Sequence, residues 1–323
     1  MHTVLITDHP APTTAIEAGL LAAIQARLIV AETGEEAELL SLAPGADAIL
    51  TCFKHVTPAV VRAATHLRVI GRYGVGVDNI AVDVATERGI PVTNVPVYCV
   101  DEVAEHAIAL MFSLARKTVA YDASIRARGW DIKTGMPMYR IAGSTFGILG
   151  FGHIGRAVAR RAIGLEMRVL ASDGFAKPAD VAAAGVELVE LDELLTRSDV
   201  VSIHVPLNAE THHMIGAGHL ARMKSTSFLI NCARGAVVDL DALVVALHEG
   251  QIAGAGLDVF EPERLSVDHP LMGARNTVLT PHVAFYSEQS IAELQRIAIE
   301  NVIAVLTGRT PTSVVNAPVA QSR

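Results

Sequence analysis

The chain has 323 residues, of which 51% are hydrophobic and 19% charged, and its formal net charge at pH 7 is -8. This length is enough for two domains, and the composition excludes a disordered chain. The acidic balance excludes nucleic acid as the main partner, because phosphate backbones are bound by basic surfaces.

The cysteine spacing argues against a disulfide-rich or zinc-binding protein, and the hydropathy argues against a membrane or secreted protein. Cys52, Cys99 and Cys232 are far apart and form no CxxC pair, so neither a disulfide framework nor a zinc site is expected. No segment reaches the ~18 uninterrupted apolar residues of a membrane span, and residues 1–10 lack the basic start of a secretory signal. We therefore expect a cytoplasmic protein with no metal and no membrane partner.

Short apolar runs alternate with amphipathic helical patterns in the first third of the chain. Strands are predicted at 3–7, 26–31, 46–51, 67–72 and 91–95, and helices at 15–24, 35–43, 57–65 and 82–89. This alternation predicts a parallel sheet with right-handed crossovers. The abundance of Ala and Val over aromatic residues suits strands that helices cover on both faces.

A long helix is predicted next, from Asp101, its candidate N-cap, to about residue 129. Its apolar positions are Val103, Ala107, Leu110, Met111 and Leu114. The apolar run AIALMFSLA favours packing against a second subunit, and therefore a homodimer; the alternative is a helix buried within one chain. An irregular segment follows up to residue 143.

The alternation then restarts. Strands are predicted at 145–150, 167–172, 186–190, 199–206, 225–231, 253–260 and 276–282, and a last helix at 290–308. The stretch GILGFGHIGRAVARR follows the GxGxxG pattern at Gly150, Gly152 and Gly155. The first two glycines permit a tight turn and the close approach of a pyrophosphate, and the third lets helix and strand pack closely.

Asp173 ends the strand after this turn. A carboxylate there can accept hydrogen bonds from a ribose 2′-hydroxyl and would repel a 2′-phosphate, so NAD is favoured over NADP. The alternative is a βαβ unit that binds no nucleotide, with Asp173 a solvated loop carboxylate.

Polar residues follow the later strands, where ligands bind in open α/β sheets. Among them, His282 can exchange a proton near neutral pH, Glu263 can stabilise the protonated imidazole, and Arg234 can bind a carboxylate with its planar fork. Reduction of a 2-keto acid needs these groups. Singly each has another explanation: Arg234 could cap a helix or pair with Asp239, Glu263 could be a solvated loop residue, and His282 could end a strand.

These residues and their motifs resemble the D-isomer-specific 2-hydroxyacid dehydrogenase family. The matching motifs, from about residue 70 to 290, are GRYGVGVDNI, GILGFGHIG, VSIHVPL, INCARGAVVD, GAGLDVFEPE and LTPHVAFYSEQS. Within the family, RYGVGVDNI and FYSEQS are most similar to the C-terminal-binding-protein branch and its bacterial enzyme relatives, and less similar to phosphoglycerate dehydrogenase.

The resemblance implies an α/β fold with two Rossmann-like, doubly wound parallel-sheet domains and a cleft between them. Residues 1–98 and 291–323 would form a flavodoxin-like substrate-binding domain, and residues 99–290 the NAD-binding Rossmann domain.

The resemblance also implies roles for individual residues. Arg234 would bind the substrate's carboxylate and carbonyl, Glu263 would pair with His282, and His282 would be the acid/base. The NAD site would be lined by Gly150, Phe151, Gly152, His153, Ile154, Gly155, Asp173, His204, Val205, Pro206, Thr211, Cys232, Ala233 and Asp258.

The substrate would also meet a loop of the other domain. The amides of Val75 and Gly76 would hold its carboxylate. The implied substrate-binding residues are Arg72, Tyr73, Gly74, Val75, Gly76, Arg234 and Phe285. In the C-terminal-binding-protein branch the position of Phe285 is often tryptophan, so the preferred substrate side chain stays open.

The implied function is NAD-dependent reduction of a small 2-keto acid, or oxidation of the corresponding D-2-hydroxy acid, by a cytoplasmic homodimer. The alternatives are a D-3-phosphoglycerate dehydrogenase, for which Arg72, Lys54 and His55 supply cations, and a glyoxylate or hydroxypyruvate reductase. A third alternative is the oxidation of phosphite or formate, of which formate oxidation is disfavoured by the Arg-Glu-His set. An NAD-sensing module that binds protein partners is the alternative from another class.

Overall fold

The computed structural model describes residues 1–316, which form two compact units. The first unit contains residues 1–98 and 287–316, and the second is Cys99–Tyr286. The sequence analysis places the second boundary at residue 290. The unit changes earlier because Ser287 caps the last helix, which begins at Glu288. Residues 317–323, expected in the substrate-binding domain, lie outside the described residues.

The first unit contains a parallel sheet in the order β2-β1-β3-β4-β5. Its strands are β1 (Thr3–Ile6), β2 (Arg27–Val30), β3 (Ala48–Thr51), β4 (Val69–Arg72) and β5 (Val92–Thr93). This is the flavodoxin-like order, in which the direction of strand addition reverses between β1 and β3 while all strands stay parallel. All five predicted strands are confirmed, each somewhat shorter than its apolar run.

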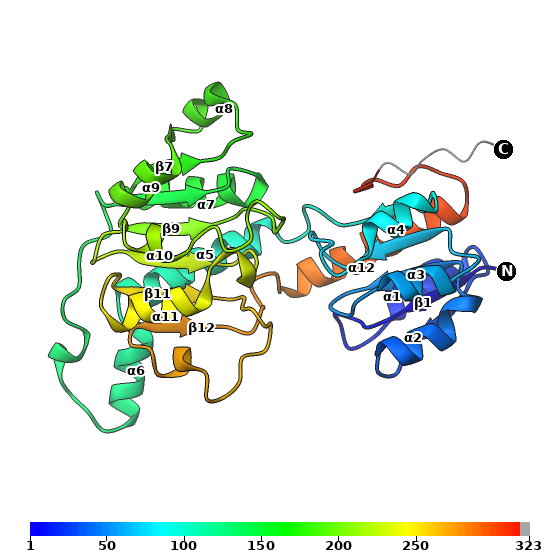
Figure 1. The fold of residues 1–323 in the computed structure, drawn as a ribbon, viewed down its shortest axis with the longest axis horizontal. Coiled ribbons are helices and arrows are strands. Elements are labelled where there is room, and N and C mark those ends of the chain that lie inside the picture. The colour runs from blue at the N-terminus through cyan, green and yellow to red at the C-terminus, as the bar shows by residue number, and fades with distance from the viewer. Residues whose placement is uncertain (317–323) are drawn as a thin grey trace. The chain divides into compact units, whose positions relative to one another are not determined.

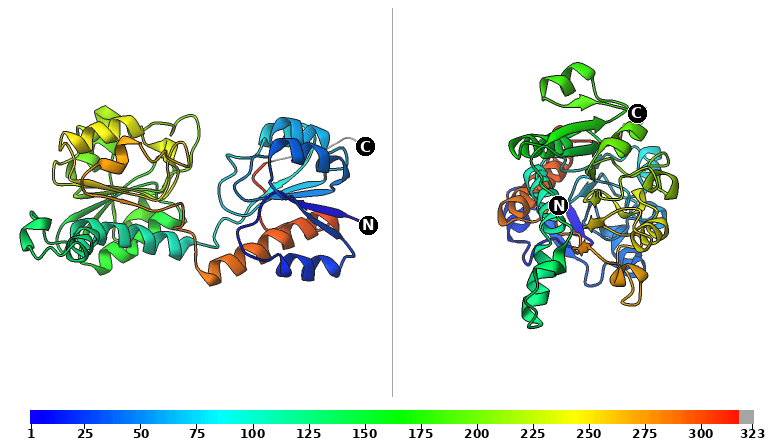
Figure 2. Two further views of the ribbon diagram at one scale, coloured as in Figure 1. Left: turned by 90° about the horizontal axis from the view of Figure 1, so that it is seen from below. Right: turned by 90° about the vertical axis from the view of Figure 1, so that its left-hand side faces the viewer.

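Helices cover both faces of this sheet (Figures 1 and 2). On one face lie α1 (Ala15–Ala22) and α12 (Glu288–Leu306), and on the other α2 (Glu36–Leu42), α3 (Pro58–Ala63) and α4 (Val82–Glu87), with a 3-10 turn at Ala43–Gly45. The last helix packs closely on the sheet, since a Cβ on Gly71 would lie 3.0 Å from Val302.

The second unit contains a parallel sheet in the order β12-β11-β10-β9-β6-β7-β8. The strands are β6 (Thr145–Leu149), β7 (Arg168–Ser172), β8 (Glu187–Leu188), β9 (Val200–Ile203), β10 (Phe228–Asn231), β11 (Gly254–Leu257) and β12 (Thr277–Leu279). The order is that of a dinucleotide-binding doubly wound sheet with one more strand at its edge. The predicted α/β class with two Rossmann-like units is confirmed.

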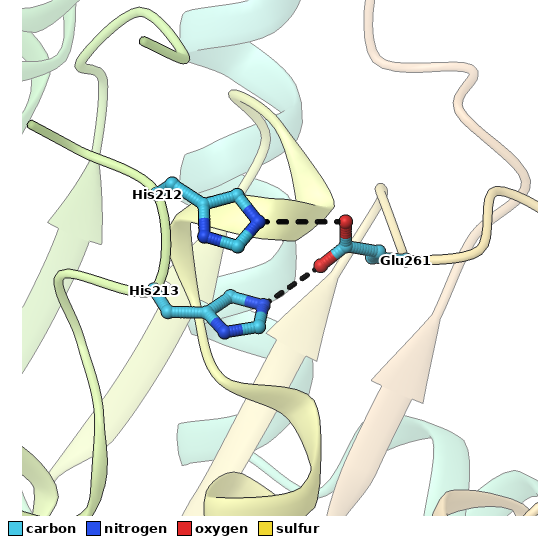
Figure 3. A group of neighbouring side chains, drawn as sticks. All are labelled: His212, His213 and Glu261. Atoms are coloured by element: carbon cyan, nitrogen blue, oxygen red, sulfur yellow. Dashed lines mark hydrogen bonds and ion pairs between the residues drawn. The ribbon is translucent and has the colours of Figure 1, made fainter. Parts of the chain in front are cut away.

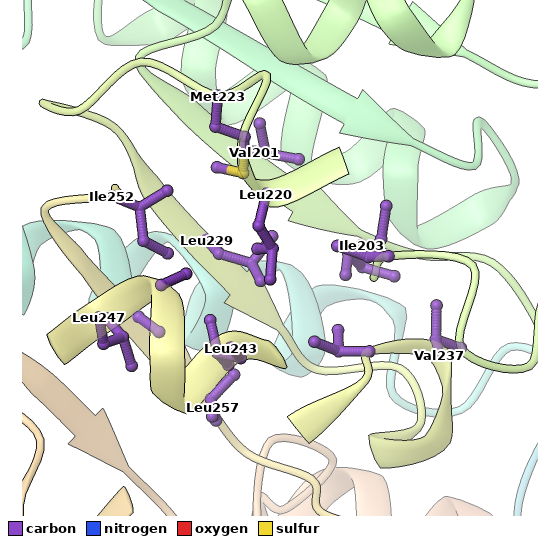
Figure 4. Packing of buried hydrophobic residues seen from close by; sticks show 14 of the residues in the cluster. Val201, Ile203, Leu220, Met223, Leu229, Val237, Leu243, Leu247, Ile252 and Leu257 are labelled. Atoms are coloured by element: carbon purple, nitrogen blue, oxygen red, sulfur yellow. The ribbon is translucent and has the colours of Figure 1, made fainter. Parts of the chain in front are cut away.

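Helices also cover both faces of the second sheet (Figure 2). One face carries α5 (Val100–Ala115) and α7 (His153–Gly164), and the other α9 (Leu191–Arg197), α10 (Ala217–Leu220) and α11 (Leu240–His248), with α8 (Pro178–Ala183) near β8. Figure 4 shows Leu243 of α11 in one buried cluster with Leu229 of β10 and Leu257 of β11. Three 3-10 turns lie at Ile132–Gly135, Gly235–Val237 and Pro270–Gly273. Within residues 1–316, no helix combines the length and apolarity of a membrane span.

The long helix predicted from Asp101 is two helices. Cys99, not Asp101, is the N-cap of α5, and Asp101 lies in its first turn. The break falls at Lys117, whose φ of 56° is left-handed, and α6 (Thr118–Arg126) follows. The Lys117 ammonium bonds Asn276 Oδ1 and lies 5.5 Å from the centre of the Phe228 ring. These tertiary contacts override the continuous helical pattern.

The apolar face of α5 is buried inside its own unit. A Cβ on Gly256 of β11 would lie 2.9 Å from Leu110 Cβ, so helix and sheet are in direct contact. This supports the alternative of a helix buried within one chain. The exposed apolar residues come afterwards, where α6 and the following segment extend away from the body of the unit (Figure 2): Val119, Ile125, Trp130, Ile132, Met136 and Tyr139.

Candidate active site

The predicted site residues of the second unit follow strands whose carboxyl ends lie at one edge of the sheet. His282 follows β12, Asp258 follows β11, His204 follows β9, and Asp173 follows β7. Between β9 and β7 lies β6, which ends at the glycine turn, so this turn occupies the point where strand order reverses. Ligands of open α/β sheets bind there.

The glycine turn is shaped for the close approach of a phosphate group. Gly150 has a left-handed φ of 95°, and a Cβ there would lie 2.7 Å from the backbone of His204. Gly152 caps α7, and the space where its Cβ would lie has no atom within 4 Å. The first amides of a helix have no intrahelical partner and carry the positive end of its dipole. These features fit the pyrophosphate of a dinucleotide.

Asp173 also fixes the glycine turn. One of its oxygens accepts the Phe151 amide at 2.7 Å, and the other accepts the amides of Phe175 at 2.7 Å and Ala176 at 3.0 Å. It is therefore not a freely solvated loop carboxylate. The predicted bond from Asp173 to a ribose remains a prediction.

Several of the remaining NAD-site candidates of this edge are uncharged. His204 Nε2 lies 2.8 Å from Ser202 Oγ, and burial lowers the pKa of His204 to about 4, so its imidazole is neutral at pH 7. Burial raises the pKa of the Cys232 thiol. The Thr211 hydroxyl donates to the Pro206 carbonyl at 2.6 Å and so closes the loop after β9.

His282 and Glu263 are in direct contact. Nδ1 of His282 bonds Glu263 Oε1, with side chains 23% and 52% exposed. The backbone of His282 is left-handed, with a φ of 53°, a conformation that a non-glycine residue keeps only where its surroundings impose it. The rings of His282 and Phe285 form a T-shaped pair with 6.1 Å between ring centres.

Asp258 imposes that backbone conformation. It is fully buried, and its carboxylate accepts the Thr280 hydroxyl at 2.6 Å and the amides of Val283 and Ala284 at 2.9 Å. Its carbonyl accepts the His282 amide at 2.7 Å. The sequence analysis assigns Asp258 to the NAD site, and the structure shows it holding the loop that carries His282.

His106 is a part of this arrangement that the sequence analysis missed. From α5, its Nε2 lies 2.9 Å from Thr280 Oγ1 and 3.6 Å from Asp258 Oδ1. His106 precedes Thr280 by 174 residues, so only the tertiary fold joins them. No motif of the sequence signals the contact.

The turn that carries Arg234 is fixed by its neighbours. The side chain of buried Asn231 donates to the Arg234 carbonyl at 2.9 Å and accepts the Ala233 amide at 3.0 Å. Gly235 packs directly on the backbone of Phe260, where a Cβ would overlap it. Asp239, the alternative partner considered for Arg234, caps α11 by accepting the Ala242 amide.

A second histidine–glutamate contact ties two loops of this edge together. In Figure 3 the rings of His212 and His213 both point toward Glu261. The distances from their Nε2 atoms to the carboxylate are 3.8 Å and 2.8 Å, and the rings stack with centres 4.0 Å apart. All three side chains are exposed, and such pairs stabilise a fold by only about 0–1 kcal/mol. The contact nevertheless joins the loop after β9 to the loop that carries Glu263.

The predicted substrate loop of the first unit follows β4. Asn94 Nδ2 donates to the Val75 carbonyl at 2.7 Å, and the Val95 amide donates to the Gly74 carbonyl at 2.9 Å. Among the described residues, neither the Val75 amide nor the Gly76 amide donates a hydrogen bond. Both amides are therefore available to an anion.

Two neighbours of this loop differ from expectation. The Tyr73 side chain is 1% exposed and its hydroxyl bonds Glu17 at 3.0 Å, so a ligand at the loop would not meet the phenol. Arg72 is also buried; it donates to the Tyr73 carbonyl, and its Nε has no partner among the described residues. Lys54 is paired with Glu35 at 2.6 Å.

Comparisons with known proteins agree with this geometry. The chain is 46% identical over 267 residues to a glyoxylate reductase of Korarchaeum cryptofilum, covering 82% of this chain and 80% of that protein. It is 40% identical over 282 residues to a D-3-phosphoglycerate dehydrogenase of Archaeoglobus fulgidus, covering 87% of this chain and 53% of the longer protein.

The fold is similar to that of a D-lactate dehydrogenase of Aquifex aeolicus, solved with NAD and lactic acid. The TM-score is 0.89 with 28% identity, over 98% of this chain and all of that one. Residues 108–284 match the family model described as the NAD-binding domain of D-isomer-specific 2-hydroxyacid dehydrogenases. The chain therefore belongs to the D-isomer-specific 2-hydroxyacid dehydrogenase family, NAD-dependent oxidoreductases that act on CH–OH groups.

Proposed function

We propose that this dehydrogenase interconverts a small 2-keto acid and its D-2-hydroxy acid, with His282 as the proton donor and acceptor. The observation that carries this proposal is the contact of His282 with Glu263, on a loop that buried Asp258 fixes at the edge of the NAD domain. An imidazole with a carboxylate partner suits a group that gains and loses a proton near neutral pH.

NADH, when bound, supplies a hydride to the carbonyl carbon of the keto acid. His282 then donates a proton to the carbonyl oxygen, and in the oxidative direction it takes the proton back. Because Nδ1 contacts Glu263, proton exchange with the substrate would use Nε2. Glu263 orients the ring and stabilises its charged form. The half-buried Arg234 would bind the substrate's carboxylate and polarise its carbonyl.

The glycine turn is proposed to hold the pyrophosphate and Asp173 the adenosine ribose. The free space at Gly152 and the helix amides beside it support the first role. The residues proposed to line the rest of the NAD site follow the neighbouring strands: His204, Val205, Pro206, Thr211, Cys232, Ala233 and Asp258.

The first unit, with α12, is proposed to be the substrate-binding domain. The amides of Val75 and Gly76 in its loop would take the substrate's carboxylate. Phosphoglycerate is disfavoured, because Lys54 is paired with Glu35 and Arg72 is buried. Glyoxylate is the first substrate to test, since relatives more than 40% identical are named glyoxylate reductases.

A homodimer is part of the proposal. The segment from α6 to Tyr139 exposes Trp130, Ile132 and Met136 by 91%, 70% and 59%. Such an apolar arm on a soluble enzyme is the kind of surface that a second copy covers. A cytoplasmic location is also proposed, because the reaction depends on NAD and the three cysteines are free thiols.

The test is to follow NADH absorbance with purified protein and glyoxylate, hydroxypyruvate, pyruvate and phosphohydroxypyruvate. We expect turnover with at least one unphosphorylated keto acid and weaker turnover with the phosphorylated one. Tight NADH binding without turnover of any of the four would contradict the proposal and favour a protein-interaction module of the C-terminal-binding-protein kind.

A further inference from the structure

A carboxylate is completely buried in the first unit. Glu17, on α1, has an exposed fraction of 0%. Its oxygens lie 2.9 Å from His9 Nε2, 3.0 Å from the Tyr73 hydroxyl, and 3.1 and 3.2 Å from Gln295 Nε2. These partners come from the segment after β1, the end of β4, and α12. A buried charge is costly unless it is fully paired, and this one is.

The pair is ionic. Burial opposes a charge on His9, but the bond to Glu17 and the charges of Glu17 and Asp8 outweigh it and raise the pKa of His9. Burial likewise opposes a charge on Glu17, but the bond from His9 outweighs it and lowers the pKa of Glu17. His9 Nδ1 also lies 2.8 Å from the Ala11 carbonyl oxygen.

The hydrogen bonds around Glu17 fix Tyr73, the residue directly before the loop Gly74–Gly76. The Tyr73 ring is held edge-on to His9, with 5.4 Å between ring centres, and its amide donates to the Thr51 carbonyl at 2.8 Å. The phenol is buried and cannot touch a ligand of the loop. Any effect of its hydroxyl on that ligand must pass through the backbone.

A second connection to the loop also comes from α12, the helix that carries Gln295. Asn301, a buried residue of α12, donates to the Asn94 carbonyl at 3.3 Å, and Asn94 Nδ2 donates to the Val75 carbonyl at 2.7 Å. Gln295 and Asn301 of α12 therefore connect to the loop at two points. Gln295 does so through Glu17 and Tyr73, and Asn301 through Asn94 and Val75.

We propose that His9, Glu17 and Gln295 are positioning residues which, together with Asn301, hold the loop Gly74–Gly76 in the conformation that receives the substrate's carboxylate. This inference rests on the proposed role of the loop in substrate binding. A buried ion pair is a poor means of stabilising a fold, since apolar side chains of similar volume often serve as well. Here several donors converge on the Glu17 carboxylate, which is bonded to Tyr73 directly before the loop. Such an arrangement suits a role in fixing the conformation of the loop.

The experiment measures kcat and both KM values for Glu17→Gln and Tyr73→Phe with the keto acid that the wild-type enzyme reduces. We expect the KM for the keto acid to rise about fivefold to tenfold, as the loss of one buried hydrogen bond implies. The kcat and the KM for NADH should change by less than about twofold. Tyr121→Phe is the matched control, because it removes one hydroxyl bond, to the Ile132 carbonyl, in the second unit. It should leave all three constants unchanged.

A merely structural network gives a different result. In that case the variants unfold at lower temperature than wild type but keep the wild-type KM for the keto acid, and the inference is overturned. Should Glu17→Gln fail to fold, Tyr73→Phe decides, since it leaves the bonds of Glu17 to His9 and Gln295 in place. Failure of the proposed function would be distinct, because the wild-type enzyme would then reduce no keto acid.

Discussion

Both units carry a histidine–glutamate pair, and the two pairs differ in their access to water. The side chains of His9 and Glu17 in the first unit are 8% and 0% exposed. Those of His282 and Glu263 in the second unit are 23% and 52% exposed. The first pair has all its polar partners within the protein, whereas the second lies on a loop at the carboxyl edge of the sheet.

This difference separates a pair that holds structure from a pair that can react. A buried ion pair with additional hydrogen bonds resists any change of protonation, because the remaining charge would be left without compensation. A proton donor in catalysis must change protonation in every turnover, which requires exchange with solvent. The same two residue types therefore serve opposite purposes, and the variants below test that contrast.

The largest effect is expected from His282→Ala. It removes the proposed proton donor, so kcat should fall by about a hundredfold to ten-thousandfold. The Kd for NADH, measured by fluorescence titration, should stay near the wild-type value. His9→Gln should not approach this loss of kcat. An equal loss in both variants would show that the contrast between the pairs is wrong.

Glu263→Gln should have the next largest effect. The amide still contacts His282 but no longer stabilises its protonated form, so kcat for keto-acid reduction should fall by about tenfold to a hundredfold. A kcat equal to that of wild type would argue that Glu263 does not act on His282.

Asp173→Ser sharpens the assignment of the cofactor. Removal of the carboxylate should raise the ratio of kcat/KM for NADPH to that for NADH by about tenfold, because the 2′-phosphate is no longer repelled. Activity with NADH should fall as well, since Asp173 also holds the Phe151 amide. The prediction fails if discrimination between the two cofactors is unchanged.

The smallest effect is a dependence of stability on pH. Because the pKa of His9 is raised above 6.5, its contribution is complete below that pH and is lost as pH rises through the raised value. Because the pKa of Glu17 is lowered below 4.5, its contribution is complete above that pH and is lost as pH falls through the lowered value. The free energy of unfolding of wild type relative to a His9→Gln, Glu17→Gln double variant should therefore be largest between pH 4.5 and 6.5. Urea titrations across pH 4 to 9 would measure it, and a pH-independent difference would contradict an ionic pair.

The sheets and the strand-end residues were predictable because periodicity and turn chemistry are local. The glycine turn, Asp173 and the positions of Arg234, Glu263 and His282 after successive strands follow from the sequence alone. The break at Lys117 was not predictable, because it depends on contacts with Asn276 and Phe228 that the fold creates.

Buried polar residues were the hardest to interpret from sequence. Asp258 is predicted to line the NAD site, and the sequence gives no sign that its carboxylate also holds the His282 loop together with Thr280. Glu17 lies in an amphipathic helical pattern that gives no sign of a buried charge. Apart from His9, which precedes Glu17 by 8 residues, the partners named here lie tens to hundreds of residues away. Hydrogen-bond satisfaction across such separations is a property of the tertiary structure.

The return of α12 to the first unit has a consequence for biosynthesis. The second unit is one continuous segment, Cys99–Tyr286, and its sheet is complete before the last helix leaves the ribosome. The first unit needs α12 to cover Gly71, so the part of this face that α1 leaves bare stays open until about 200 further residues have been translated. The NAD domain should therefore fold first, although its sequence starts later, and a nascent chain halted at Tyr286 would expose that apolar face to chaperones.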